Sequence, residues 1–171
     1  MATYDWNERH ILTFDKNIAL STNDLRVFYN GTKEAIHGVS MQFPKNQVTA
    51  LIGPSGSGKS TYLRALNRMN DTIDGARVTG EIMYEGVNIS DPKVNVYEVR
   101  KQIGMVFQRP NPFPKSIYEN IAFIHRREGI KDKKKLDEIV ETSLKQAALW
   151  EQVKDNLNKS ALALSGGQAQ R

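Results

Sequence analysis

The sequence contains no cysteine and only three histidines among its 171 residues. Without cysteine the chain can form neither a disulfide nor a thiolate metal site. His10, His37 and His125 are scattered rather than paired at the short spacing typical of zinc ligands, so a zinc site is not expected. Long apolar runs are missing too, since no stretch approaches the roughly 18 consecutive apolar residues of a membrane helix.

A secretory signal is also missing. Residues 1–16 mix charged, polar and aromatic side chains and lack a basic start followed by an apolar run. We interpret residues 1–16 as a loose leader and the chain as cytoplasmic.

The net charge is +5, yet no surface for nucleic acid is indicated. The densest basic run, residues 131–135, opens a helical pattern and is typical of a solvated helix face. No aromatic side chains alternate with it, as a base-stacking surface would require. No nucleic-acid partner is expected.

Alternating apolar residues predict antiparallel strands at residues 25–29 and 39–43, joined near an Asn30–Gly31 turn. A further strand of the edge type is predicted at residues 78–84. The run at residues 48–52 is rich in β-branched side chains and suits a central strand of a parallel sheet, buried on both faces. Residues 103–107 are predicted as a second core strand.

Four helices are expected between and after these strands. The first spans residues 59–69 and a short one spans 94–101. Ser116 and Glu119 have the capping-box spacing that marks a helix start. The clearest helix covers residues 132–150, where apolar side chains recur every three or four positions.

Residues 53–60 read Gly-Pro-Ser-Gly-Ser-Gly-Lys-Ser and fit the P-loop pattern at every fixed position. Phosphate oxygens need several donors at once, and backbone N–H groups reach them only where no Cβ intervenes. A helix that begins near Lys59 adds its positive end, and the Ser60 hydroxyl suits Mg²⁺. The predicted ligands are ATP and Mg²⁺. The expected nucleotide contacts in this segment are Gly53, Pro54, Ser55, Gly56, Ser57, Gly58, Lys59, Ser60 and Thr61.

Residues 164–168 read Leu-Ser-Gly-Gly-Gln. Following a P-loop, this segment makes the chain resemble the ABC ATPase family, whose signature it matches. The resemblance implies that Ser165 caps a helix. It also implies that Ser165, Gly166, Gly167 and Gln168 face a nucleotide bound by the opposite subunit of a dimer.

Two further residues receive roles from this resemblance. Gln108 follows an apolar segment, as does the family's Q-loop glutamine, which contacts Mg²⁺ and the attacking water; it is the expected catalytic residue and a metal contact beside Ser60. Tyr29 stands where the family places an aromatic that stacks on adenine. Asn30 separates Tyr29 from Gly31, whereas the glycine is usually adjacent, and the alternative for Tyr29 is a packing role.

Two longer stretches, residues 64–71 and 108–114, resemble the ATP-binding subunits of phosphate importers. Ser57 and Ala169 differ from the cysteine and glutamine that are common there. The resemblance implies a second ATP-binding subunit, two membrane permease subunits docked near residues 111–114, and an external phosphate-binding protein that acts indirectly. It also implies a peripheral position on the cytoplasmic face of the membrane.

The implied fold is α/β. It comprises a P-loop NTPase core with a parallel sheet and flanking helices, an antiparallel β subdomain, and a helical signature subdomain at about residues 112–171. We expect residues 17–171 to be the N-terminal portion of this domain. The family's Walker B acid, catalytic glutamate and switch histidine do not occur, so the C-terminal part of the core is expected to be missing, and this segment alone to bind ATP without turnover.

Other classes of ATPase are the alternatives. A DNA-repair or chromosome-organising ATPase would carry long coiled coils between the two motifs, and no sustained heptads occur there. A P-loop kinase or GTPase would not need the signature. An ATPase for another substrate, or a soluble ABC protein acting on ribosomes, is opposed only by the importer-like stretches.

Overall fold

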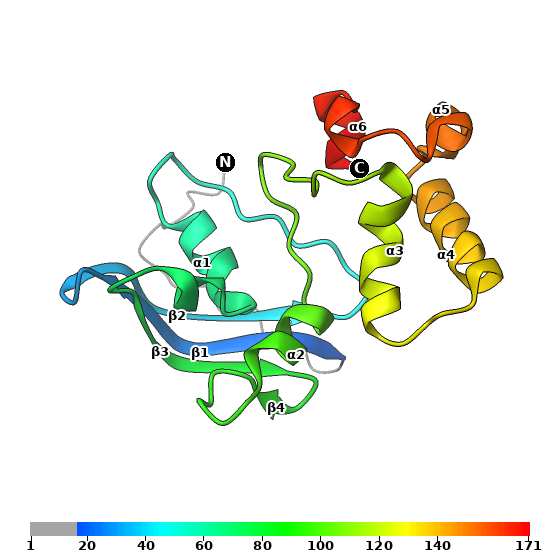
Figure 1. The fold of residues 1–171 in the computed structure, drawn as a ribbon. Helices are drawn as coiled ribbons and strands as arrows, with labels where there is room; N and C mark the ends of the chain where they lie inside the picture. The colour runs from blue at the N-terminus through cyan, green and yellow to red at the C-terminus, as the bar shows by residue number, and fades with distance from the viewer. Residues whose placement is uncertain (1–16) are drawn as a thin grey trace, which may run out of the picture. The chain divides into compact units, whose positions relative to one another are not determined.

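The computed structural model describes residues 17–171 and divides into two compact units, with the boundary between Met105 and Val106. The first unit carries the strands and the glycine-rich loop, and the second is helical (Figure 1). The leader expected at residues 1–16 lies outside the described residues. The expected helical subdomain at about residues 112–171 falls within the second unit.

An antiparallel sheet of four strands forms the base of the first unit. Its strands, in the spatial order β2-β1-β3-β4, are β2 (Lys33–Pro44), β1 (Ile18–Tyr29), β3 (Arg77–Tyr84) and β4 (Val87–Asn88). The predicted hairpin is confirmed, because β1 pairs with β2 and Tyr29 lies opposite Lys33 across the turn. The prediction of β3 as an edge strand is wrong. It pairs with β1 on one side and with the two-residue β4 on the other, through a tight turn at Glu85 and Gly86.

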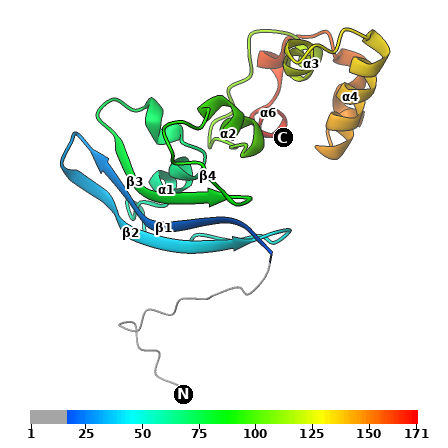
Figure 2. The ribbon, with the colours of Figure 1, turned by 90° about the horizontal axis from the view of Figure 1, so that it is seen from below.

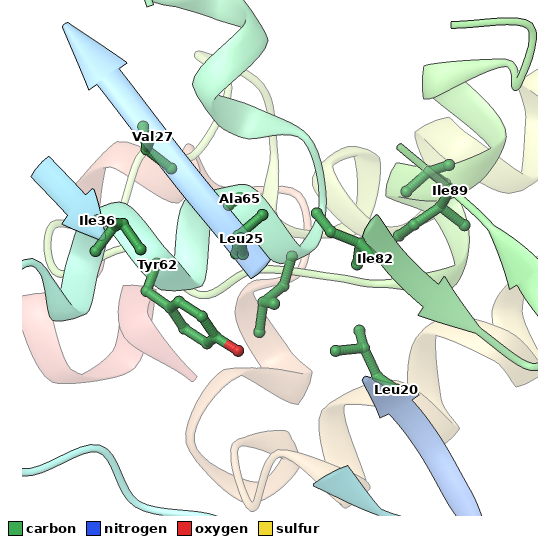
Figure 3. Close-up of a cluster of buried hydrophobic side chains, with 10 residues drawn as sticks. Leu20, Leu25, Val27, Ile36, Tyr62, Ala65, Ile82 and Ile89 are labelled. Atoms are coloured by element: carbon green, nitrogen blue, oxygen red, sulfur yellow. The ribbon is translucent and has the colours of Figure 1, made fainter. Parts of the chain in front are cut away.

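The helix α1 (Lys59–Leu66) covers one face of this sheet, as both ribbon views show (Figures 1 and 2). Tyr62 and Ala65 of α1 are buried against β1 and β2 (Figure 3). Burial of an aliphatic side chain contributes about 1.5–3 kcal/mol, so this cluster fixes α1 on the sheet. The buried core consists of Leu20, Leu25, Val27, Ile36, Tyr62, Ala65, Leu66, Ile82, Ile89 and Val99.

The helix predicted at residues 59–69 is shorter than expected. It ends at Leu66 because Arg68 adopts a left-handed φ of 61°, after which a 3₁₀ turn, η1 (Met69–Thr72), continues the chain. The short helix near residue 94 is confirmed as α2 (Val96–Gln102), and the Asn95 side chain caps it by accepting from Tyr97 N.

The two predicted core strands are not formed. Residues 48–52 and 103–107 belong to no strand, so both predictions are wrong for this structure. Val48 and Ile52 are 100% and 93% exposed instead of buried. A strand needs a neighbour to accept and donate its ladder hydrogen bonds. Within residues 17–171 no segment pairs with either of them.

The second unit is built from helices α3 (Ile117–Arg127), α4 (Lys133–Gln146), α5 (Trp150–Val153) and α6 (Gly166–Gln170), with 3₁₀ turns η2 (Lys154–Asn156) and η3 (Ala161–Ala163). Helices α3 and α4 lie side by side (Figure 1). They enclose a separate core of Ile117, Ala122, Leu136, Val140, Leu144, Leu149, Val153 and Ala161.

The predicted start of α3 is confirmed in one half only. Ser116 Oγ accepts from Glu119 N at 3.1 Å, whereas the Glu119 carboxylate pairs with Arg126 instead of returning to the cap.

The helix predicted at residues 132–150 ends four residues early, at Gln146. Ala148 adopts a φ of 51°, and Leu149 N donates back to Leu144 O at 2.8 Å. This is a Schellman stop, which buries Leu149 in the core.

Candidate functional site

The glycine-rich loop, residues 53–58, leads directly into α1. Gly58 occupies the N-cap position with φ 90°, a left-handed conformation that favours glycine. A Cβ at this position would lie 2.6 Å from Ile36 Cδ1 and 3.1 Å from Ala35 O. The backbone angle therefore favours glycine where the loop meets the helix, and a side chain here would also have to displace Ile36 Cδ1.

The first turn of α1 has donors without side-chain partners. Gly58 supplies no side-chain cap, and no acidic residue stands in the first turn. The first N–H groups of a helix have no acceptor within the helix, and they carry the positive end of its dipole. This turn is therefore suited to an anion such as a phosphate group.

The Lys59 side chain reaches back across the loop. Its Nζ donates to the Gly53 and Pro54 carbonyl oxygens at 2.7 Å each and to Ser57 Oγ at 3.2 Å. These acceptors are neutral, and none of the acidic side chains between residues 17 and 171 pairs with Lys59. The ammonium charge is thus positioned by the loop without being neutralised.

The loop and the start of α1 form one wall of a pocket of about 620 Å³. The opposite wall comes from the end of β1 and the start of β2. The structure thus brings Tyr29 together with the loop and Thr61, whereas the stacking of Tyr29 on adenine stays a prediction. The lining residues are Tyr29, Lys33, Glu34, Ala35, His37, Ser55, Gly56, Ser57, Gly58, Lys59, Ser60 and Thr61.

Three polar residues of this pocket escaped the sequence analysis: Lys33, Glu34 and His37. Glu34 accepts from Arg26 at 3.0 Å and lies 3.3 Å from His37 Nδ1. The Asn30–Gly31 turn was the available signal, because hairpin pairing places Lys33 opposite Tyr29 and Glu34 opposite Phe28.

Side-chain hydrogen bonds join β1 to α1 beside the pocket. The Tyr29 hydroxyl is bonded to Thr61 Oγ1 at 3.2 Å and to Asn70 Oδ1 at 3.4 Å. Asn70 is fully buried and donates through Nδ2 to Thr61 O at 2.9 Å. Further along, the hydroxyls of Tyr62 and Thr22 are bonded at 2.7 Å. Burial raises the pKa of Tyr62, and the bond with Thr22 opposes that shift.

The signature segment lies in the second unit. Ser165 is the N-cap of α6, as expected, and its Oγ accepts from Gln168 N at 3.3 Å. Gln168 Oε1 in turn accepts from Ser165 N at 3.0 Å, which completes a capping box. Gly166 and Gly167 form the first positions of the helix.

Gln108 also belongs to the second unit. It is exposed and sits in a bend, directly after Phe107, whose carbonyl accepts from Gln170 Nε2 at 2.7 Å. The main chain beside Gln108 is thereby held by a side chain of α6. The catalytic and metal-binding roles of Gln108 stay predictions.

Mg²⁺ prefers a few protein oxygens together with water and phosphate oxygens rather than a closed protein cage. The exposed Ser60 hydroxyl at the start of α1 fits that requirement. Across residues 17–171 no group of three or more His, Asp or Glu side chains is arranged to enclose a metal. In the same part of the chain, every helix is too short or too polar to cross a membrane.

Among curated proteins, the chain is 85% identical over 170 residues to phosphate import ATP-binding protein PstB 2 of Lactococcus lactis subsp. lactis. It is 71% identical over 172 residues to the protein of the same name in Streptococcus agalactiae serotype III. These alignments cover 99% and 100% of this chain, but only 63% and 64% of the two relatives.

Solved structures confirm the expected fold. CbiO1 from Clostridium perfringens, described as part of the ABC transporter complex cbiONQ, matches with a TM-score of 0.71 and 25% identity, over 91% of this chain and 59% of that protein. A bacterial Atm1-family ABC exporter with ATP bound matches with a TM-score of 0.70 and 26% identity, over 97% of this chain and 28% of the exporter. The sequence profile described as ABC transporter matches residues 36–171, and the chain therefore belongs to the ABC transporter family.

Proposed function

We propose that this chain is the ATP-binding part of a subunit that energises the import of inorganic phosphate. The observation that carries the nucleotide half of the proposal is the placement of Lys59. Its charged Nζ is held by neutral acceptors of the loop beside an uncapped helix start. The phosphate half is supported by the two relatives, both of which are named phosphate import ATP-binding protein PstB 2.

In this proposal the triphosphate of ATP lies along the loop from Gly53 to Gly58. Lys59 binds its β and γ groups, and the N–H groups of the first turn of α1 donate to the remaining oxygens. Ser60 would hold Mg²⁺, which when bound supplies positive charge against the phosphates, and the family resemblance assigns Gln108 a contact with that ion. Gln108 would also orient the attacking water.

The proposed partners follow the family. A second ATP-binding subunit would place its nucleotide against Ser165, Gly166, Gly167 and Gln168. Two permease subunits would dock at residues 111–114, on the cytoplasmic face of the membrane, and an external phosphate-binding protein would deliver the solute to them. ATP would shift the dimer toward a closed state by contacts that exist only in that state.

Two measurements test the two halves of the proposal separately. Calorimetry should show that the protein carrying this sequence binds Mg·ATP, and that Lys59→Ala weakens the binding by on the order of 100-fold. Uptake of labelled phosphate by cells should fall when the gene is replaced by the Lys59→Ala form. ATP binding with unchanged phosphate uptake would favour an ABC ATPase that serves another solute.

A further inference from the structure

Two reciprocal hydrogen bonds cross between β1 and α1. In one, the tyrosine is on the helix, where the Tyr62 hydroxyl meets Thr22 of β1 at 2.7 Å. In the other, the tyrosine is on the strand, where the Tyr29 hydroxyl meets Thr61 of α1 at 3.2 Å. Both bonds fix the helix on the sheet, but only the second ends on a residue that lines the pocket beside the glycine-rich loop.

Thr61 is hydrogen-bonded through both its side-chain hydroxyl and its main-chain carbonyl. Its side-chain oxygen is bonded to Tyr29, and its main-chain carbonyl accepts from Nδ2 of Asn70 at 2.9 Å. Tyr29 also reaches Oδ1 of Asn70, which is fully buried. Tyr29, Asn70 and Thr61 are therefore linked to one another by hydrogen bonds. Thr61 is the third residue of α1 and the neighbour of Ser60.

From this set we infer that Tyr29 is a positioning residue that acts through its hydroxyl. It holds Thr61, and with it the first turn of α1, in the arrangement that receives the triphosphate. The inference rests on the proposed function and deepens it. It assigns to Tyr29 a contribution to phosphate recognition that does not depend on the base of the nucleotide.

The directions of the helix N–H groups determine how well this turn binds phosphate. A ligand that binds to helix N–H groups requires those groups in fixed directions before it arrives, because ordering them on binding costs affinity. A tyrosine whose hydroxyl is tied to the helix supplies that order, and a phenylalanine in the same place does not. A ring that acts only by stacking on a base would behave in the opposite way, because phenylalanine stacks as well as tyrosine.

The test measures calorimetric affinity for Mg·ATP and for magnesium tripolyphosphate, which has the phosphates but no base. Tyr29→Phe should weaken both ligands by the same factor, roughly three- to tenfold, which corresponds to the loss of one hydrogen bond. The matched control is Tyr62→Phe, which removes the reciprocal bond. It should lower the melting temperature as Tyr29→Phe does and leave both affinities within twofold of the wild type.

Two more variants separate positioning from stacking and from general loss of structure. In a double-mutant cycle, Thr61→Val and Tyr29→Phe should be strongly non-additive, because each removes the same bond. Tyr29→Leu should weaken tripolyphosphate at least as much as Tyr29→Phe does, and any further loss confined to ATP would measure stacking on the base. A Tyr29→Phe protein with wild-type affinity for both ligands would overturn the inference. So would a Tyr29→Leu protein that loses ATP but keeps tripolyphosphate, since this result means base stacking.

Failure of the proposed function would look different. In that case wild-type protein would bind neither ligand, or Lys59→Ala would bind both as the wild type does, whatever stands at position 29. Wild-type binding that depends on Lys59 but not on the Tyr29 hydroxyl would overturn the positioning role alone.

Discussion

The chain contains two glycine-serine turns that each open a helix, and they treat the orphan N–H groups of that helix in opposite ways. The P-loop turn ends at Gly58, which offers no side chain to α1. The signature turn begins α6 with Ser165, whose Oγ accepts from Gln168 N while Gln168 returns a bond to Ser165 N. The start of α1 is open, because its N–H groups have no side-chain cap. The start of α6 is closed, because a capping box satisfies its N–H groups within the turn.

The segments that lead into the two turns differ as well. Residues 48–52, before the P-loop, form no regular structure and expose Val48 and Ile52 almost completely. Before the signature, η3 is anchored by Ala161, which is buried and donates through its N–H to Lys115 O at 2.9 Å. The open helix start thus follows an unpaired segment, and the closed one follows a packed segment.

The comparison shows why similar compositions serve different purposes. A helix start that keeps its N–H groups free, with a lysine across the loop, suits an anion on the same chain. A helix start that satisfies its own donors is stable without a ligand. In the proposed dimer, such a turn is already folded before the partner subunit brings its nucleotide.

The largest expected effect concerns the unpaired lead-in segment. A polypeptide of these 171 residues should be partly folded and prone to aggregate, because an apolar segment with free ladder groups pairs readily with other chains. Uncovered apolar surface forfeits about 25 cal/mol per Å², so a few hundred Å² approach the stability of a whole domain. Denaturation followed by circular dichroism, with size-exclusion chromatography, measures this.

A paired substitution sharpens the test. Replacing Val48 and Ile52 with lysine should reduce aggregation of the 171-residue polypeptide. The same change should destabilise a longer protein in which these residues are buried. A clean monomer with one cooperative transition, obtained without ligand, would contradict the prediction.

The next effect compares the two turns directly through glycine. Gly58→Ala places a Cβ 2.6 Å from Ile36 Cδ1 at a φ of 90°, with strain of about 1–3 kcal/mol before the collision is counted. It should remove ATP binding and lower the melting temperature. Gly166→Ala meets no atom within 4 Å and should change neither quantity in a monomer. Equal effects of the two variants would contradict the expected difference between the two turns.

A slightly smaller effect on ATP affinity is expected when the polar side chains of the two turns, Lys59 and Ser165, are removed. Lys59→Ala should weaken Mg·ATP binding to monomeric protein by on the order of 100-fold, since hydrogen bonds to charged groups contribute about 1.5–3 kcal/mol each. Ser165→Ala should leave that affinity within twofold, because Ser165 would contact a nucleotide held by the partner. Calorimetry on monomeric protein distinguishes the two, and equal losses would contradict the division of roles.

Local patterns predicted the parts of the fold that local interactions determine. The alternation from Leu25 to Tyr29 and the Asn30–Gly31 turn gave the hairpin, because both signals lie within one short segment. The cap at Ser116 was predicted for the same reason, whereas the cap at Ser165 was implied by the family resemblance. The end of α4 was missed because Ala148 is not a residue that signals a left-handed stop, and only the burial of Leu149 explains it.

Features that depend on distant segments could not be predicted in the same way. The run at residues 48–52 carries a strand-like composition, yet a strand forms only where a neighbour is available. The hydrogen bonds of Tyr29 with Thr61 and Asn70 connect residues more than 30 positions apart, and no rule of sequence spacing predicts such bonds. The sequence located the candidate site but did not reveal which atoms of Tyr29 contact it.

The smallest expected effect concerns the closed turn itself. Ser165→Ala removes the oxygen that accepts from Gln168 N, and loss of an N-cap typically costs about 1 kcal/mol. Because α6 is short and exposed, the cost should appear as local fraying, not global unfolding. Hydrogen exchange at the amides of residues 167–169 should accelerate roughly fivefold while the melting temperature hardly moves. Ser165→Asp is the matched control: aspartate also accepts at an N-cap, so exchange should stay slow. If Ser165→Ala left exchange unchanged, the capping box would not be what stabilises this turn, and the contrast with the P-loop would rest on Lys59 alone.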